Sequence, residues 1–289
     1  MKILLAVDGS DQSYEAVRSL CVLAPAEELV ILHVMHLPHL SYPIFGSGLD
    51  KDLALTVEQA MKEEGEQLLD RMVSLLPPHH GSPVKRLESG SPAEVILSTA
   101  DSMGADLIVL GARGLSALQE HVFGSVSHRV MTHAPCAVLV VKSPLRQLQE
   151  LLVPIGNPED GQAIGDLLLK QPFREPPAIT VLHVLPFATP VWPVGALIPE
   201  AFRKEMLSYA EEMTGAVSSR LTAAGYQAKG RAVMGPPAES IAQEAATLHV
   251  DLVMMRSHSR SGISRFLLGS VSHSVMHQIA CSFLLVKGR

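Results

Sequence analysis

A five-residue sequence, Gly-Ser-Val-Ser-His, occurs twice in this chain of 289 residues, at 124–128 and again at 269–273. The same separation of 145 residues relates two Gly-x-Pro-Ala-Glu sequences, at 90–94 and 235–239. A period this long is that of a whole domain, and it far exceeds the roughly 20–50 residues of a solenoid repeat. We therefore predict that the chain consists of two copies of one domain.

The two domains are predicted at residues 1–143 and 150–289, joined by a short linker. In each copy, short apolar runs alternate with segments of helical spacing. In the first copy, residues 3–7, 107–110 and 137–141 are apolar throughout, as in parallel strands that helices cover on both faces. Alternating strands and helices favour right-handed crossovers. We predict an α/β fold with two doubly wound parallel sheets of about five strands each.

Charge and cysteine content exclude several classes of protein. The net charge is −6 and no run of Lys and Arg is present, so nucleic acid is not expected as a partner. Three cysteines cannot form a disulfide framework, which indicates a reducing compartment. The first apolar run is stopped early by Asp8, and no run approaches the ~20 apolar residues of a membrane span. We expect a cytoplasmic protein without a membrane partner.

Glycine and serine residues follow the fourth apolar run of the first copy. Gly111 and Gly114 come directly after this run, and Gly124 and Ser125 open the next predicted helix. Glycine permits positive φ and close approach to a ligand. A helix start offers unpaired N–H groups to a phosphate, and the serine hydroxyls could add donors. Asp8 ends the first run on the same sheet edge, where its carboxylate could accept hydrogen bonds from a nucleoside. These residues predict a nucleotide site.

The chain resembles a tandem universal stress protein along its whole length. The resemblance rests on the Gly-x2-Gly-x9-Gly-Ser pattern at 111–125, the turn at Asp8, Leu-His-Val at 32–34 and Gly-Ser-Pro-Ala-Glu-Val-Ile at 90–96. It implies a five-stranded parallel sheet of order 3-2-1-4-5 in each copy. It also implies ATP as ligand, with Mg²⁺ bound through the phosphates. The residues that it assigns to ATP are Ala6, Asp8, Val34, Leu110, Gly111, Arg113, Gly114, Gly124, Ser125, Val126 and Ser127.

The second copy departs from this pattern. Arg256 stands at the position of Gly111, Ser259 at that of Gly114, and Gly156 takes the place of Asp8. The arginine could fill the pocket, and non-glycine residues make positive φ costlier. Only the Gly-Ser-Val-Ser sequence of the helix start is intact, and it could still hold a small anion. We expect this copy to bind ATP poorly or not at all.

Histidine and cysteine residues are interpreted as structural. His33 and His183 recur at one strand position, although only one copy has the motif, so packing is favoured over chemistry. His128 and His273 follow the two helix starts and are read in the same way. A metal site at His33, His36 and His39 is not expected, because Pro38 and the strand exit interrupt any fixed geometry. Cys136 and Cys281 head the last strand of each copy and are interpreted as buried thiols.

Three functions remain open on the sequence alone. The first is a regulatory ATP-binding stress protein with at most slow hydrolysis. The second is an ATP-using enzyme of the related nucleotide α-hydrolase-like fold. Such an enzyme usually has a Ser/Gly-rich loop after the first strand, whereas residues 7–13 hold one glycine. The third is a ligand-free scaffold for protein contacts. No catalytic residue is predicted, because the sequence has no Walker A motif and no G-x-G-x-x-G.

The final strands of the two copies suggest how the copies meet. Residues 137–142 and 282–287 are strongly apolar, and exposed edges of this kind promote aggregation. Members of the resembled family commonly pair through this strand. We predict that the two strands pair antiparallel within the chain as an intrachain pseudo-dimer, with the linker turning at Pro144. A homodimer of the whole chain is a further expectation.

In each copy, one proline-rich loop follows the second strand. The two loops contain Phe45 and Trp192. Two interpretations are open: each loop folds over its own domain, or it serves as a lid or partner surface.

Overall fold

A computed structural model describes residues 1–36, 51–114, 123–186, 200–257 and 269–287. The loops with Phe45 and Trp192 lie outside these residues. The first copy consists of β1 (Lys2–Val7), α1 (Asp11–Ser19), the 3-10 turn η1 (Leu20–Val22), β2 (Glu28–Met35), α2 (Lys51–Ser74), η2 (Pro78–His80), β3 (Val84–Ser89), α3 (Pro92–Met103), β4 (Leu107–Gly111), α4 (Ser125–His133) and β5 (Ala137–Val141). The second copy consists of β6 (Glu150–Pro154), α5 (Pro158–Leu168), β7 (Ala178–Pro186), α6 (Glu200–Ala223), β8 (Gln227–Gly235), α7 (Pro237–Thr247), β9 (Leu252–Arg256), α8 (Ser270–Gln278) and β10 (Ser282–Val286).

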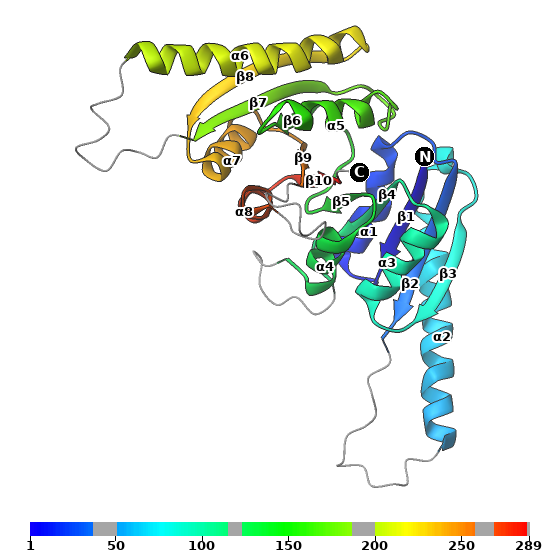
Figure 1. Ribbon diagram of the computed structural model, residues 1–289. Coiled ribbons are helices and arrows are strands. Elements are labelled where there is room, and N and C mark those ends of the chain that lie inside the picture. Colours follow the sequence, from blue (N-terminus) through cyan, green and yellow to red (C-terminus); the bar gives the residue numbers. More distant parts are fainter. Residues whose placement is uncertain (37–50, 115–122, 187–199, 258–268, 288–289) are drawn as a thin grey trace, which may run out of the picture.

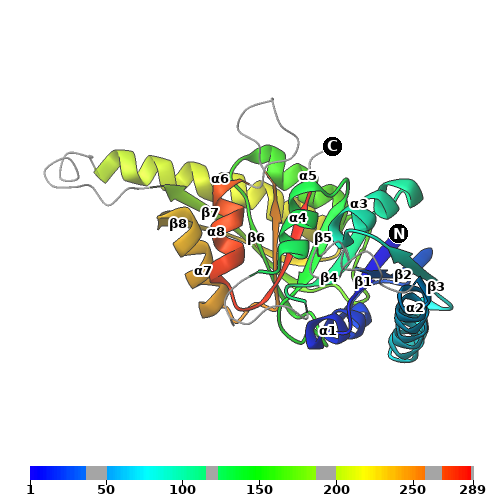
Figure 2. The same ribbon diagram turned by 90° about the horizontal axis from the view of Figure 1, so that it is seen from below.

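The strands form one sheet of ten, with the order β3-β2-β1-β4-β5-β10-β9-β6-β7-β8. Each half therefore has the predicted order 3-2-1-4-5, and its strands run parallel. The predicted pairing of the fifth strands is confirmed, because β5 and β10 pair antiparallel. The two predicted sheets are thus halves of a single sheet, with helices on both faces (Figures 1 and 2).

Local sequence signals set the ends of several helices. Ser10 caps α1, and its hydroxyl accepts a hydrogen bond from the N–H of Ser13 at 3.2 Å. Pro92 opens α3 with its fixed φ. Gly104 ends α3 at φ +61°, a left-handed conformation that favours glycine.

Equivalent residues of the two copies face each other within the sheet and on both of its faces. In the sheet, Leu139 pairs with Leu284, its counterpart 145 residues later. On one face the rings of His128 and His273 lie 5.5 Å apart, and this pair has the same separation in sequence. On the other face a single bridge joins Leu23 to Phe173, each nine residues before the Leu-His-Val of its copy. A pseudo-two-fold axis therefore passes through the sheet at the β5–β10 contact.

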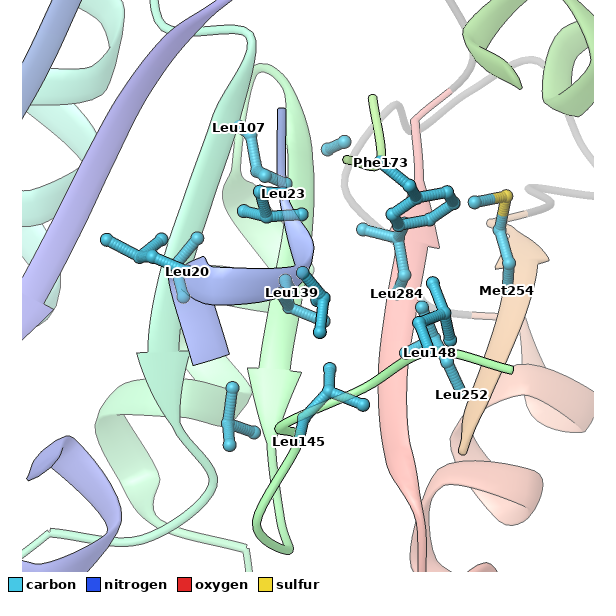
Figure 3. Close-up of a cluster of buried hydrophobic side chains, with 14 of the residues drawn as sticks. Leu20, Leu23, Leu107, Leu139, Leu145, Leu148, Phe173, Leu252, Met254 and Leu284 are labelled. Atoms are coloured by element: carbon cyan, nitrogen blue, oxygen red, sulfur yellow. The ribbon is translucent and has the colours of Figure 1, made fainter. Parts of the chain in front are cut away.

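The hydrophobic core does not divide at the domain boundary. One buried cluster lies under α1, α2, α5 and α6, and another lies under α3, α4, α7 and α8. Each cluster contains residues of both copies. Figure 3 shows Leu139, Leu284 and Phe173 of the first cluster, with Leu145 and Leu148 of the linker beside them. The linker is thus part of the core, and the two copies share it.

Two lysines at the ends of the paired strands reach across to the other copy. The ammonium of Lys142 donates to the carbonyls of Met276 and Ile279, where α8 ends. Lys287 donates to the carbonyl of Thr132 in the last turn of α4, at 3.1 Å. Cations at helix C-termini are stabilising. Burial lowers the pKa of Lys142, and it lowers the pKa of Lys287 to about 8.

The histidines at the recurring strand position make the same backbone contact in both copies. The Nδ1 atom of His33 lies 2.8 Å from the carbonyl oxygen of Val7. His183 makes the same contact with Ile155 at 2.8 Å. Because one contact occurs in both copies, it belongs to the fold.

The cysteine thiols are held in their neutral form. Burial raises the pKa of Cys136 to about 12 and that of Cys281 to about 11, so neither is a thiolate at neutral pH. Within the described ranges, no group of three His, Cys, Asp or Glu is placed to hold a metal ion, and His39 lies outside them. None of the helices placed by the structure is both long and apolar enough to cross a membrane.

Candidate functional site

A cavity of about 580 Å³ opens at the C-terminal ends of β1, β2 and β4. All eleven residues that the family resemblance assigns to ATP line it. The cavity lies where strand order reverses on either side of β1, which is the usual ligand position in an open α/β sheet. Its volume is within the range of roughly 300–1,000 Å³ found for small-molecule sites.

The carboxylate of Asp8 is oriented by the turn that follows β1. The N–H and the hydroxyl of Ser10 donate to Asp8 Oδ1 at 3.0 and 2.6 Å. Gly9 makes the turn at φ +81°, a conformation that other residues rarely adopt. Its N–H donates to Ser13 Oγ at 3.1 Å. These contacts fix one oxygen of the carboxylate at the cavity wall.

Gly111 and Gly114 are required for space rather than for backbone conformation. Neither has the positive φ that we expected from the sequence. A Cβ atom on Gly111 would lie 2.9 Å from the Gln12 backbone carbon, and a Cβ on Gly114 would overlap Oδ2 of Asp8. The expectation was wrong because the turn after β4 is ordinary, whereas the segment after β1 packs directly against it.

The start of α4 is fastened to the end of β4. The N–H of Gly124 donates to the carbonyl of Ala112 at 2.9 Å, and the hydroxyl of Ser127 donates to the same carbonyl at 2.7 Å. Ser127 is buried, so its hydroxyl proton is used inside the protein and not offered to a ligand. The first helical bond runs from the N–H of His128 to Gly124. The three preceding N–H groups, of residues 125–127, have no acceptor within the helix.

Helix α2 provides a cavity wall that sequence reasoning missed. Its lining residues are Met61, Glu64, Gly65, Leu68 and Arg71, and Tyr14 of α1 lies beside them. One signal for this wall was present in the sequence. Gly65 interrupts a long helical pattern, and a Cβ there would come within 2.7 Å of Leu87 Cδ1. A glycine inside a helix often marks such a close contact.

The turn after the first strand is one residue shorter in the second copy. The N–H of Gly156 donates to Asp160 at 2.8 Å, as that of Gly9 donates to Ser13. Asn157 caps α5 as Ser10 caps α1. Counted from the strand, Gly156 follows Ile155 as Asp8 follows Val7, as the sequence predicted; counted from the helix, Gly156 takes the place of Gly9. The shorter turn therefore has no carboxylate at the position of Asp8.

A buried ion pair replaces two cavity-lining positions in the second copy. Arg256 Nη1 lies 3.6 Å from Asp160 Oδ1, and the side chains are only 23% and 2% exposed. By strand position Arg256 corresponds to Gly111, and by its hydrogen bond Asp160 corresponds to Ser13. Both counterparts line the cavity of the first copy. At these two positions the copies share a fold but differ in side-chain chemistry.

Two doubly wound α/β domains in tandem, with a glycine-lined cavity at the switch point of the first, define the class of this protein. The model of the universal stress protein family matches residues 1–142 and 148–287. The chain belongs to the universal stress protein family.

Individual relatives agree with this assignment. The chain is 33% identical over 149 residues to a universal stress protein of Methanocaldococcus jannaschii, a match over 50% of this chain and 84% of the relative. A universal stress protein of Mycolicibacterium smegmatis is 25% identical over 99% of this chain and 97% of its own. The crystal structure of a universal stress protein from Archaeoglobus fulgidus has a TM-score of 0.66 at 19% identity, covering 99% of this chain and 96% of that one. That likeness concerns the fold alone.

Proposed function

We propose that the chain is a regulatory stress protein that binds one ATP, in the cavity of its first copy. The observation that carries the proposal is the convergence of eleven residues, from four separate segments of the chain, on one cavity. These segments bring together a carboxylate, a cation, glycine backbone and a helix N-terminus. This set of groups suits a nucleotide with its sugar at one end and its phosphates at the other.

Each part of the cavity has a proposed role. The unpaired N–H groups at the start of α4 would bind the phosphates, together with the positive end of the helix dipole. The guanidinium of Arg113 would add a permanent positive charge. Asp8 would accept hydrogen bonds from the ribose, and Val34 would border the adenosine. Mg²⁺ would be held through the phosphate oxygens, where it neutralises charge.

Hydrolysis is expected to be slow at best. Catalysis would need a general base within hydrogen-bond reach of the attacking water. The Nδ1 atom of His33 is engaged by Val7, and Oδ1 of Asp8 is engaged by Ser10. Turnover near the ~10 per second of an ordinary enzyme would contradict this and favour an ATP-using enzyme.

Two measurements on the full chain test the proposal. Protein purified without added nucleotide is heat-denatured, and the released small molecules are identified by mass spectrometry. ATP or its diphosphate is expected in an amount no greater than one per chain. If no nucleotide is released, and calorimetry detects no ATP binding at millimolar concentration, the proposal is wrong and a ligand-free scaffold is favoured.

A further inference from the structure

Gln12 stands beside the cavity and contacts the loop that carries the two glycines. It lies in the first turn of α1 and is not one of the residues that line the cavity. Its side-chain carbonyl, Oε1, accepts a hydrogen bond from the backbone N–H of Arg113 at 2.7 Å. This contact joins segments 101 residues apart in the sequence.

The end of β4 and the start of α1 lie very close together at this contact. A side chain on Gly111 would meet the backbone of Gln12 itself, at 2.9 Å. The end of β4 therefore lies closer to α1 than any other residue type would allow. Ser10 adds one weaker link, because its hydroxyl lies 3.4 Å from the carbonyl oxygen of Arg113. Gln12 makes the short hydrogen bond at this junction.

We propose that Gln12 is a positioning residue, which holds the 111–114 loop against α1 and so presets the loop for its ligand. The inference rests on the proposed function for the identity of the ligand, but the holding of the loop is a property of the ligand-free chain. Residue 113 carries the predicted phosphate-binding guanidinium, and residue 114 contacts Asp8. A loop released at Arg113 would have to be ordered again whenever a nucleotide binds, and that ordering would weaken the affinity.

The second copy provides an internal comparison. The hydrogen-bond pattern that matches Asp160 to Ser13 places Glu159 at the position of Gln12. Glu159 is exposed to solvent. The same substitution at this position is therefore a matched control for effects on the start of a helix.

The experiment compares Gln12→Met, Gln12→Glu and the control Glu159→Met in the full chain. Methionine keeps the length of the side chain and removes the acceptor, whereas glutamate keeps the acceptor. Amide hydrogen exchange at Arg113 is measured by NMR without ligand, ATP affinity by calorimetry, and the melting temperature in parallel. In Gln12→Met, exchange at Arg113 should become at least about tenfold faster and ATP affinity should fall about tenfold, because a hydrogen-bonded amide loses its partner. Gln12→Glu should retain the slow exchange, and Glu159→Met should match the wild type.

Unchanged exchange at Arg113 in Gln12→Met would overturn the inference, as would exchange in Gln12→Glu as fast as in Gln12→Met. If Gln12→Met lowered the free energy of unfolding, read from the melting temperature, by as much as it lowered the free energy of ATP binding, Gln12 would have a merely structural role. That result would also overturn the inference. If the wild type itself does not bind ATP, the proposed function fails, and the exchange rates alone decide whether Gln12 holds the loop.

Discussion

The carboxylate of Asp8 determines which residue can stand at position 114. Its Oδ2 atom occupies the space that any side chain on Gly114 would need. The second copy is consistent with this dependence, because it has Ser259 at the position of Gly114 and no carboxylate at the position of Asp8. The two residues are therefore best considered as one unit.

Substitution Gly114→Ala tests this unit directly. The added methyl group displaces Asp8 from the cavity wall, so ATP affinity should fall by at least about a hundredfold, while the fold persists because the site lies at the surface edge of the sheet. Calorimetry and far-UV circular dichroism measure the two effects. The matched control is Ser259→Ala, which should change neither. ATP binding that survives in Gly114→Ala would place the nucleotide elsewhere.

For single residues, the sequence predicted residues that line the cavity but not the reason why glycine is needed at positions 111 and 114. The family resemblance implied eleven ATP-binding residues, and all eleven line the cavity. The reason for Gly111 and Gly114 was missed because it depends on Asp8 and Gln12, about a hundred residues away. The pair of Arg256 with Asp160 was missed too, because its members are also about a hundred residues apart. In addition, pattern matching does not detect that the turn before Asp160 is one residue shorter.

Among the elements, β5 and β10 carry the contact between the copies. Val140 of β5 pairs with Phe283 and is fully buried. Val84, on the outer edge strand β3, is 49% exposed. Val140 belongs to the buried cluster under α3, α4, α7 and α8, on a strand paired on both sides, whereas Val84 lies in neither buried cluster.

Substitution Val140→Lys should destabilise the chain by about 3 kcal/mol or more, because it buries an unpaired charge. Val84→Lys is the control and should stay within about 0.5 kcal/mol of the wild type. Urea denaturation followed by circular dichroism measures both. Equal, small effects at the two positions would show that β5 and β10 do not pair in solution.

Helices α4 and α8 meet through a cluster of histidines. The rings of His128 and His273 lie 5.5 Å apart, and those of His273 and His277 lie 4.7 Å apart. Phe123 lies 5.1 Å from His277, with the ammonium of Lys142 over its ring at 5.3 Å. Burial lowers the pKa of both His128 and His277, neighbouring histidines lower both further, and Lys142 also lowers that of His277. All the groups that act on these two are themselves cationic when charged.

The contact between α4 and α8 should therefore weaken in acid. Because the folded pKa of His128 and His277 lies below the usual 6.5, the unfolded chain binds more protons as the pH falls. Stability should be full above pH about 6.5 and decrease below it, until the folded pKa values are passed. The melting temperature between pH 7.5 and 5 measures this decrease.

The control for acid lability is the double variant His273→Gln/His277→Gln, whose melting temperature should depend less on pH. His80, which is buried and has a pKa also lowered by burial, contributes with the same sign and is present in both proteins. If the melting temperatures of the two proteins depended on pH in the same way, the histidine cluster would not be a cause of the acid sensitivity. The existence and order of the elements were predictable from apolar periodicity, whereas this cluster was not, because helix packing brings its members together.

For the whole molecule, the shared core implies that the two copies unfold together. Phe173 of the second copy forms a β-bridge with Leu23 of the first, and both belong to the buried cluster that contains the linker residues Leu145 and Leu148. The antiparallel pairing was predictable from two uncovered apolar edges. The insertion of the linker into the core was not, because its leucines are too few to form a pattern.

One cooperative transition is expected in denaturant, with loss of amide protection in β1 and β6 at the same concentration. Phe173→Ala should lower the stability of both copies by about 3–5 kcal/mol, as large-to-small changes in a core do. Hydrogen exchange read by mass spectrometry follows each copy separately. Two separate transitions, or a loss confined to the second copy, would indicate independent domains.

One fold is present twice in this chain, and we propose that it holds a single ATP site. Titration calorimetry of the wild-type chain with ATP tests it most directly. We expect a stoichiometry of one ATP per chain. Gly114→Ala should abolish this binding, and Ser259→Gly alone should not create a second strong site. Two equivalent sites in the wild type, or full-strength binding that survives Gly114→Ala, would contradict it.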